Sequence, residues 1–503
     1  MKIRIDNNRQ KIPLTNGQMS FWYIYQLTKE TANHFLPYEF DGPLQTEHLE
    51  KVLNTLLQDN EILRVSVSDW CAIQYVCPYE YFHLPYVDLS RFSDSAIATA
   101  MGELFLKYCA PNFDLMRPPL LRACLVKLAP QKHLLMLITP HFAMDGAALH
   151  QLDIELRTLY KKALQGKPLR TTGKLSLASY ISQEQVKKNT QSESAEQFWL
   201  KQLEGIEHTY FDQSLLDISN CCRRGVFIPL SQPQLNLIGR WCSEYQLTQQ
   251  MVFLALFAKV ISKVTGNTSL CLTTVQENRD IDGARELFGA LLTSLPIPIR
   301  NLDTQPFDEL FAQVKKTTLA VYEYRHVSWS TPLSILGENK IQNRPWWLEV
   351  LTAFSGTYHF MSQESGLSPL ALKDFATIAA ADIEDNKNVK LLGPQCRAMT
   401  INVNMLPSFY EPKNQFNEAL DLDQETCQIT LQRQLDFPLP PDESEWEKDV
   451  LNFYIENHAV KGPGIRVSHQ CLTSDAEQLL KEEFEGVLEV ELSDGDHKFA
   501  SGI

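Results

Sequence analysis

The chain has 503 residues, of which 44% are hydrophobic and 21% are charged, and its formal net charge is −15 at pH 7. This composition is typical of a globular protein with a large core, and the length predicts two or more lobes or domains. The acidic balance argues against a general nucleic-acid-binding protein, which normally carries a basic excess. An acidic ligand would therefore need a local basic patch on this chain.

Neither export nor membrane insertion is indicated. Residues Met1 to Gln10 lack the apolar stretch of a signal peptide. The apolar helical stretch Met251 to Ile261 is too short to cross a bilayer and contains Lys259. The 11 cysteines include no Cys-x-x-Cys pair, which is typical of a reduced protein. We therefore expect a cytoplasmic protein without a membrane span.

Residues 1–180 predict a first, mixed α/β lobe. Thr15 is placed to cap a helix, and Glu47 to Leu57 predicts a second helix because its apolar residues recur on one face. The helix predicted from Ala147 to Leu164 has leucines at helical spacing and should bury one stripe. Between these helices, short apolar runs predict strands over Leu63 to Val67, Ile73 to Val76, Leu121 to Leu128 and Leu134 to Thr139.

The composition turns polar at residues 165–195, where we place the connection to a second lobe over 181–460. Its strongest predicted helix is Gln249 to Val264, and its strands are expected at Leu270 to Val275, Leu295 to Ile299, Val350 to Phe354 and Ala398 to Val403. The prolines and acids of Asp436 to Glu445 predict a loop. Residues 461–503 form an extension of unknown role, predicted as strand (Ile465 to Val467), helix (Asp475 to Glu485) and strand (Val487 to Leu492).

The strongest chemical signal is the segment Thr139-Pro-His-Phe-Ala-Met-Asp-Gly146, which joins a predicted strand to a predicted helix. Histidine titrates near neutral pH, so His141 at this junction is suited to take a proton. Asp145, four residues later, is placed to orient the loop. Gly146 would allow a substrate to approach the backbone closely, and amides at the start of the helix could help to hold an oxyanion. A His-x-x-x-Asp-Gly string alone is a weak signal.

Other chemistries have weaker support. His141, Asp145, His150 and Asp153 are close enough in sequence to suggest a metal site, but the Asp-Gly turn breaks the shared helical face and no His-Glu-x-x-His occurs. The chain has no Gly-x-Ser-x-Gly elbow and no Gly-x-x-x-x-Gly-Lys phosphate loop. We therefore expect no bound metal, no ATP use and no acyl-enzyme intermediate.

The segment Thr139 to Gly146 also resembles the His-His-x-x-x-Asp-Gly signature of the condensation-domain superfamily of non-ribosomal peptide synthesis, relatives of chloramphenicol acetyltransferase. Further motifs resemble that family in the same order over roughly residues 10–460. They are Ile12 to Trp22, Glu61 to Arg64, Phe113 to Arg122, Phe198 to Leu203, Asn278-Arg279 and Leu287 to Pro296. The resemblance implies an α/β fold of two chloramphenicol acetyltransferase-like lobes in a V, with the active site at their junction.

The resemblance also implies residue roles. His141, Asp145 and Gly146 would form the catalytic motif, and Asp145 would also form a structural salt bridge with Arg279 of the second lobe. The chain departs from the pattern at three places. Pro140 replaces the first histidine of the pair, Thr293-Ser294 replaces an Asn-Thr, and His326-Val327 replaces a His-Gln. Thr293, Ser294 and His326 therefore remain candidates for the substrate channel.

By resemblance, we expect a stand-alone condensation enzyme that transfers an acyl or aminoacyl group from the phosphopantetheine thioester of a carrier protein to an amine or hydroxyl acceptor. The acceptor would be a small molecule, free or carrier-bound, and no cofactor would be resident. A coenzyme A-dependent O- or N-acyltransferase of the same superfamily is the first alternative. A non-catalytic domain that recruits a carrier protein is the second.

Overall fold

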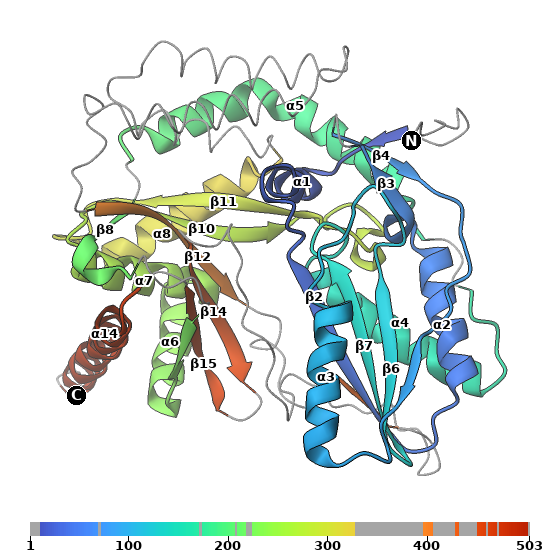
Figure 1. Ribbon diagram of the computed structural model, residues 1–503. Helices are drawn as coiled ribbons and strands as arrows, with labels where there is room; N and C mark the ends of the chain where they lie inside the picture. The colour runs from blue at the N-terminus through green and yellow to red at the C-terminus, as the bar shows by residue number, and fades with distance from the viewer. Residues whose placement is uncertain are drawn as a thin grey trace, which may run out of the picture.

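The structure is a computed structural model that describes residues 11–68, 72–170, 174–206, 209–217, 224–326, 396–405, 428–431, 450–458, 461–469 and 472–500. Its elements form two lobes (Figure 1). The right-hand lobe in this view is built mainly from N-terminal segments and the left-hand lobe mainly from later ones. Helix α5 (Leu177–Leu203) runs across the top of both lobes, so the polar connection expected at 165–195 is largely helical.

A five-stranded sheet in the order β13-β2-β7-β6-β5 organises the N-terminal lobe. Strands β5 and β6 are parallel and the other neighbours are antiparallel. Strand β7 is central and buried along nearly its whole length, as its apolar run predicts. The bounds of these strands are β2 (Asn33–Asp41), β5 (Tyr86–Asp88), β6 (Arg122–Ala129), β7 (Lys132–Pro140) and β13 (Gln428–Leu431).

Helices cover this sheet, and a small three-stranded sheet lies beside them. The apolar face predicted for the second helix is buried in α2, and α2 packs against α4. The helices are α1 (Asn16–Thr28), α2 (Thr46–Asp59), α3 (Asp94–Tyr108) and α4 (Gly146–Leu164), with a 3-10 turn at η1 (Glu61–Arg64). The small sheet has the order β1-β4-β3, with bounds β1 (Lys11–Pro13), β4 (Ile73–Val76) and β3 (Val65–Val67).

The C-terminal lobe is built on a seven-stranded sheet in the order β11-β10-β12-β14-β15-β9, with β8 added at β12. Helix α7 is buried against this sheet, and Phe257 on it stacks on Phe453 with ring centroids 4.1 Å apart. The strands are β8 (Thr209–Asp212), β9 (Arg224–Pro229), β10 (Leu270–Glu277), β11 (Leu292–Ile299), β12 (Cys396–Met405), β14 (Val450–His458) and β15 (Gly462–His469). The helices are α6 (Gln232–Glu244), α7 (Gln249–Thr265), α8 (Phe307–Glu323) and α14 (Ser474–Ala500), with 3-10 turns η2 (Gln213–Leu215) and η3 (Ala284–Glu286).

The two lobes interlock through chain segments that cross between them. Strand β13 comes from the later part of the chain but pairs with β2 at the edge of the N-terminal sheet. The segment after β10 likewise joins the N-terminal core, where Ile281, Leu287, Phe288 and Leu291 are buried. This second crossing carries Arg279 toward the N-terminal lobe.

Two details of the predicted secondary structure are wrong. Val487 to Leu492 lies inside α14, because Phe484, Val487 and Leu488 continue a helical face begun by Leu480. The first half of the strand predicted at Leu63 to Val67 is the turn η1. The predicted strand Val350 to Phe354 and the predicted loop Asp436 to Glu445 lie outside the described residues.

Residues 461–469 and 472–500 are part of the C-terminal lobe. Strand β15 pairs with β14 and β9, and α14 packs against α7. Within the described residues no single helix is long and apolar enough to cross a membrane, although α6 and α7, which are bent by 112°, pass together by length and composition.

Candidate active site

The strand-turn-helix expected around His141 is formed by β7, a short loop and α4. His141 is the first residue after β7, and its backbone N–H donates to the carbonyls of Thr31 (3.2 Å) and Ala32 (3.1 Å). A turn in the loop is closed by a bond from the Ala143 N–H to the Pro140 carbonyl at 2.9 Å. The loop is thus fastened to the segment that leads into β2.

That segment is in turn held by the motif Phe113 to Arg122. The Thr31 N–H donates to Asn112 Oδ1 (3.0 Å), and the Phe113 N–H donates to Thr31 Oγ1 (3.0 Å). The Arg122 guanidinium donates to the carbonyls of Pro111 (2.6 Å) and Asn112 (2.8 Å). Part of this motif therefore serves to position the backbone of His141.

The imidazole of His141 lies between two other rings. Phe21 from α1 stacks on it with centroids 4.1 Å apart, and His34 from β2 contacts it at 4.5 Å. The ring is deeply set yet still partly accessible. Its Nδ1 is buried, which leaves Nε2 as the nitrogen that can meet a substrate. Burial lowers the pKa of His141 to about 4, against a smaller opposing effect of a hydrogen bond to its own backbone, so the ring is neutral at pH 7.

Asp145 is the N-cap of α4, and both of its carboxylate oxygens accept hydrogen bonds. Its Oδ1 accepts from the Ala148 N–H at 2.9 Å as a helix N-cap, and its Oδ2 accepts from the Leu291 N–H at 2.9 Å. Arg279 Nη2 also donates to Oδ1 at 2.6 Å, and both side chains of this ion pair are buried. The structure therefore brings Asp145 and Arg279 together and ties the His141 loop to the segment that crosses from the C-terminal lobe.

Arg279 organises this crossing segment as well. Its Nη1 donates to the carbonyls of Ala284 and Leu287, both at 2.7 Å, and its Nη2 also reaches the Gly289 carbonyl at 3.3 Å. The buried guanidinium thus donates to three backbone carbonyls of this segment and to the Asp145 carboxylate. Removing either charge would leave unpaired polar groups in the interior.

The opening motif Ile12 to Trp22 supports the site from the other side. Thr15 caps α1, and its hydroxyl donates to the Ala290 carbonyl at 2.7 Å. Gly17 is required here, because a Cβ at this position would lie 2.3 Å from the Ala290 oxygen. Close packing of α1 on this segment brings Phe21 onto the His141 ring.

The remaining predicted residues lie in different surroundings. A Cβ added at Gly146 would meet no atom within 4 Å, so the position opens onto free space. Thr293 is buried, and its hydroxyl oxygen accepts from Asn278 Nδ2 at 2.7 Å. Ser294 is half-buried on β11. His326 is buried with Nε2 3.7 Å from Asp280, and burial lowers its pKa to about 4.

His34 and Phe21 are the contacts that sequence reasoning missed as site residues. Neither belongs to a chemical motif, and Phe21 was noted only within the opening motif. Within the described residues, no group of three or more histidine, cysteine or acidic side chains is placed to hold a metal ion.

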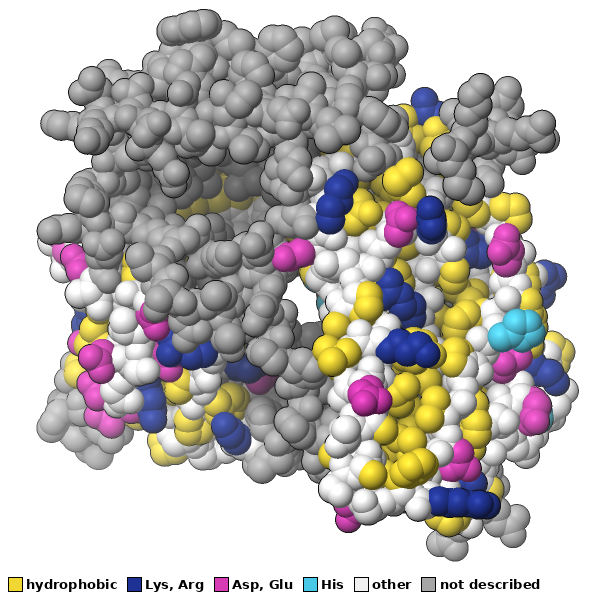
Figure 2. Space-filling view, in the orientation of Figure 1, with side chains coloured by type: hydrophobic (Ala, Val, Ile, Leu, Met, Phe, Trp, Pro, Cys, Tyr) yellow, Lys and Arg dark blue, Asp and Glu magenta, His cyan; other side chains and the backbone are white. Residues whose placement is uncertain are grey.

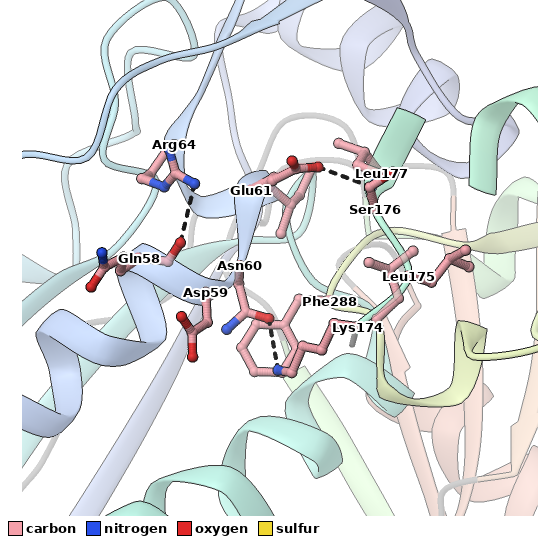
Figure 3. A pocket seen from close by; sticks show the side chains of 12 residues that line it. Gln58, Asp59, Asn60, Glu61, Arg64, Lys174, Leu175, Ser176, Leu177 and Phe288 are labelled. Carbon is pink, nitrogen blue, oxygen red and sulfur yellow. Dashed lines mark hydrogen bonds between the residues drawn. The ribbon is translucent and has the colours of Figure 1, made fainter. Parts of the chain in front are cut away.

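A separate pocket of about 170 Å³ lies where the end of α2 meets residues 174–177 and Phe288 (Figure 3). Some of its polar groups already have partners. Lys174 donates to Asn60 (3.2 Å) and pairs with Glu155, and Glu61 accepts from the Leu177 N–H at 3.0 Å. None of the residues His141, Asp145 and Arg279 lines it. The loop of His141 is therefore the better candidate for chemistry.

Comparison with known proteins identifies the family. The chain matches the condensation domain family over residues 8–358 and belongs to that family. A stretch of 330 residues, 64% of this chain, is 25% identical to 2% of the cyclosporin synthetase of Tolypocladium inflatum. The chain spans only 2% to 15% of the length of such curated relatives.

Solved structures share the fold at low sequence identity. The X-domain in complex with OxyB from teicoplanin biosynthesis superposes with a TM-score of 0.68 at 15% identity, over 98% of this chain and 95% of that one. The starter condensation domain of rhizomide synthetase, in complex with C8-CoA, gives a TM-score of 0.64 at 16% identity, over 96% and 95%. The expected α/β fold with two chloramphenicol acetyltransferase-like lobes is confirmed.

Proposed function

We propose that this chain catalyses condensation, transferring an acyl or aminoacyl group from a carrier-protein thioester to an amine or hydroxyl. The observation that carries the proposal is the His141 imidazole. It is neutral and partly accessible, its ring is contacted by Phe21 and His34, and its backbone N–H is bonded to the segment before β2. The family supports acyl transfer as the class of reaction.

In the proposed reaction, the acceptor nitrogen or oxygen attacks the thioester carbonyl while its hydrogen points at His141 Nε2. A base with a pKa near 4 is weak, so it takes a proton only as attack makes the acceptor more acidic. The C–S bond then breaks, and the proton passes to the departing sulfur to give a free thiol. The main contribution of the site would be to hold donor and acceptor together, which can be worth several kcal/mol.

The other residues would act by holding geometry. The Asp145–Arg279 pair fixes the loop that carries His141, and the Asp145 carboxylate accepts a hydrogen bond from the Ala148 N–H. The N–H groups of Gly146 and Ala147 come just before Ala148 in the first turn of α4. We propose that they stabilise the developing oxyanion. The open space beside Gly146 is consistent with a carbonyl at that place.

A carrier protein as donor is favoured by the relatives, which are peptide synthetases. On the face shown in Figure 2, Lys and Arg side chains stand among hydrophobic, Asp and Glu side chains over the N-terminal lobe, so this face is mixed in charge. With the same acyl group on both donors, we expect a higher kcat/KM for the carrier than for coenzyme A. That difference should shrink as salt screens charges.

The test is acyl transfer by purified His141→Ala. We expect a rate lower by about 10² or more, as for loss of a positioned base. His83→Ala is the control, because His83 is exposed and contacts only the Tyr81 ring among the described aromatic pairs. Equal rates for wild type and His141→Ala would contradict the proposal. Equal efficiency on both donors without salt dependence would instead favour a coenzyme A-dependent enzyme, a possibility supported by the likeness to a domain solved with C8-CoA.

A recruitment domain is the second candidate. It is favoured by the likeness to an X-domain that was solved in complex with OxyB. That X-domain has the fold of this chain and binds a protein partner. Carrier-protein binding with equal affinity by wild type and His141→Ala, together with no acyl transfer by either, would support recruitment.

A further inference from the structure

His34 makes two contacts with the loop that carries His141. Its ring lies 4.5 Å from the His141 ring at a tilt of 48°, and its Nε2 is 3.1 Å from the Met144 carbonyl oxygen. The first contact is at the beginning of the loop and the second at its end, directly before Asp145. One side chain on β2 therefore spans the loop that connects β7 to α4.

The chemistry of these contacts defines the state of His34. A carbonyl oxygen only accepts hydrogen bonds, so Nε2 must carry the hydrogen and donate it. Burial lowers the pKa of His34 to about 3, and the neighbouring His141 adds to this lowering. The Met144 carbonyl and Asp145 oppose it more weakly. His34 is thus a neutral donor at any pH where the protein is expected to work.

The position of His34 follows from the register of the sheet. In the antiparallel pair of β2 and β7, His34 is opposite Thr139, and Asn33 is opposite Pro140. The residue before His141 is a proline, and the imidazole beside His141 comes from the neighbouring strand. Residues of directly paired strands are close enough for their side chains to interact.

We infer that His34 is a positioning residue for His141. Its bond to the Met144 carbonyl fastens the end of the loop to β2, and its ring, with Phe21 opposite, holds the plane of the His141 imidazole. As a positioning residue it acts through His141, so its role in catalysis rests on the proposed function. Its effect on the state of His141 can be measured without any substrate.

The experiment follows the titration of His141 by nuclear magnetic resonance in protein isotope-labelled at histidine Cε1, with the signal assigned from His141→Asn. In the wild type we expect a pKa near 4. His34→Ala removes both contacts and admits water beside the ring, so the pKa of His141 should rise by about one pH unit or more. His34→Gln keeps a donor for the Met144 carbonyl, and His34→Phe keeps the ring contact. In each variant the pKa of His141 should therefore rise less than in His34→Ala.

His133→Gln is the matched control, because His133 lies at the other end of the same strand pair, opposite Phe40. It should leave the titration of His141 unchanged. An unchanged His141 in His34→Ala, or an equal shift in His133→Gln, would overturn the inference. If His34→Ala does not fold, the two conservative variants decide, because no shift in either would overturn it as well.

Kinetics separate this inference from the proposed function. If acyl transfer occurs, His34→Ala should lower kcat with little change in KM, because the His141 ring is no longer held in the orientation that proton transfer needs. Should no acyl transfer be found for the wild type while the His141 titration moves in His34→Ala, the proposed function fails and the positioning role stands. If His141→Ala loses activity while His34→Ala changes neither the His141 titration nor kcat, the proposed function stands and the positioning role of His34 fails.

Discussion

The ion pair between Asp145 and Arg279 should be essential to the fold of the junction. Asp145→Ala removes a 2.6 Å contact with Arg279, the N-cap of Ala148 and the acceptor of the Leu291 N–H. It leaves the buried Arg279 bonded only to carbonyls, with its charge uncompensated. Breaking a buried pair from one side costs about 3–5 kcal/mol.

The expected loss is measurable as a change in Tm. At about 2 °C per kcal/mol for a cooperative unit of roughly 250 residues, Tm should fall by about 6–10 °C. Differential scanning calorimetry gives this value. Glu483→Ala is the control, because its ion pair with Lys263 (3.2 Å) is exposed and should be worth about 1 kcal/mol or less.

A double-mutant cycle tests whether the loss comes from the pair itself. Arg279→Met should be destabilising alone, because it leaves the Leu287 carbonyl without its Arg279 donor and the Ala284 carbonyl with only the Leu287 N–H, at 3.3 Å. Combined with Asp145→Ala, it should cost less than the sum of the two by about 1–3 kcal/mol. Strict additivity, or a Tm of Asp145→Ala within about 2 °C of the wild type, would refute this reasoning.

Three further outcomes are expected. Burial raises the pKa of Glu184 to about 7 from an ordinary 4.5. The folded protein therefore holds this proton more tightly than the unfolded chain does. The resulting contribution to stability is fully present below pH 4.5 and is lost as the pH rises through 7. Glu184→Gln should therefore flatten the decline of stability above pH 5, by about 3 kcal/mol at pH 8, and an unchanged pH slope would contradict this. Gly17→Ala should destabilise by about 1–3 kcal/mol through its 2.3 Å clash with Ala290, whereas Gly102→Ala, which meets nothing within 4 Å, should not; equal Tm values would be the contrary result. Because the pKa of His141 is lowered to about 4, kcat should stay level from pH 8 down to about 5.5, and a fall centred on the ordinary value of 6.5 would show that the ring is not desolvated.

Local patterns were sufficient for the elements next to the site. The apolar run before Pro140 is β7, and the helix predicted from Ala147 to Leu164 is α4, which begins one residue earlier at Gly146. These predictions succeeded because an apolar run and a helical stripe involve residues only a few positions apart. The prediction was wrong at Val487 to Leu492, where a short apolar run carries no information on whether it continues a preceding helix.

Strand β2 was not predicted, although it brings His34 to the site. It contains Pro37, which weakens a strand pattern, and its apolar residues do not alternate regularly. A single histidine within such a segment has no local chemical signal. Its importance arises only from its pairing opposite Thr139 and the resulting contact with His141.

The turn that carries His141 could be predicted from consecutive residues alone. His141 and Asp145 are four residues apart between a strand and a helix, and that spacing is a property of a few consecutive residues. The remaining geometry depends on contacts between segments that are far apart in the sequence. Arg279 lies 134 residues from Asp145, and the resemblance indicated their pairing, but its geometry depends on the segment that crosses between the lobes. The low pKa values of His141 and His34 likewise come from burial, and desolvation depends on the atoms that surround a group in the folded protein.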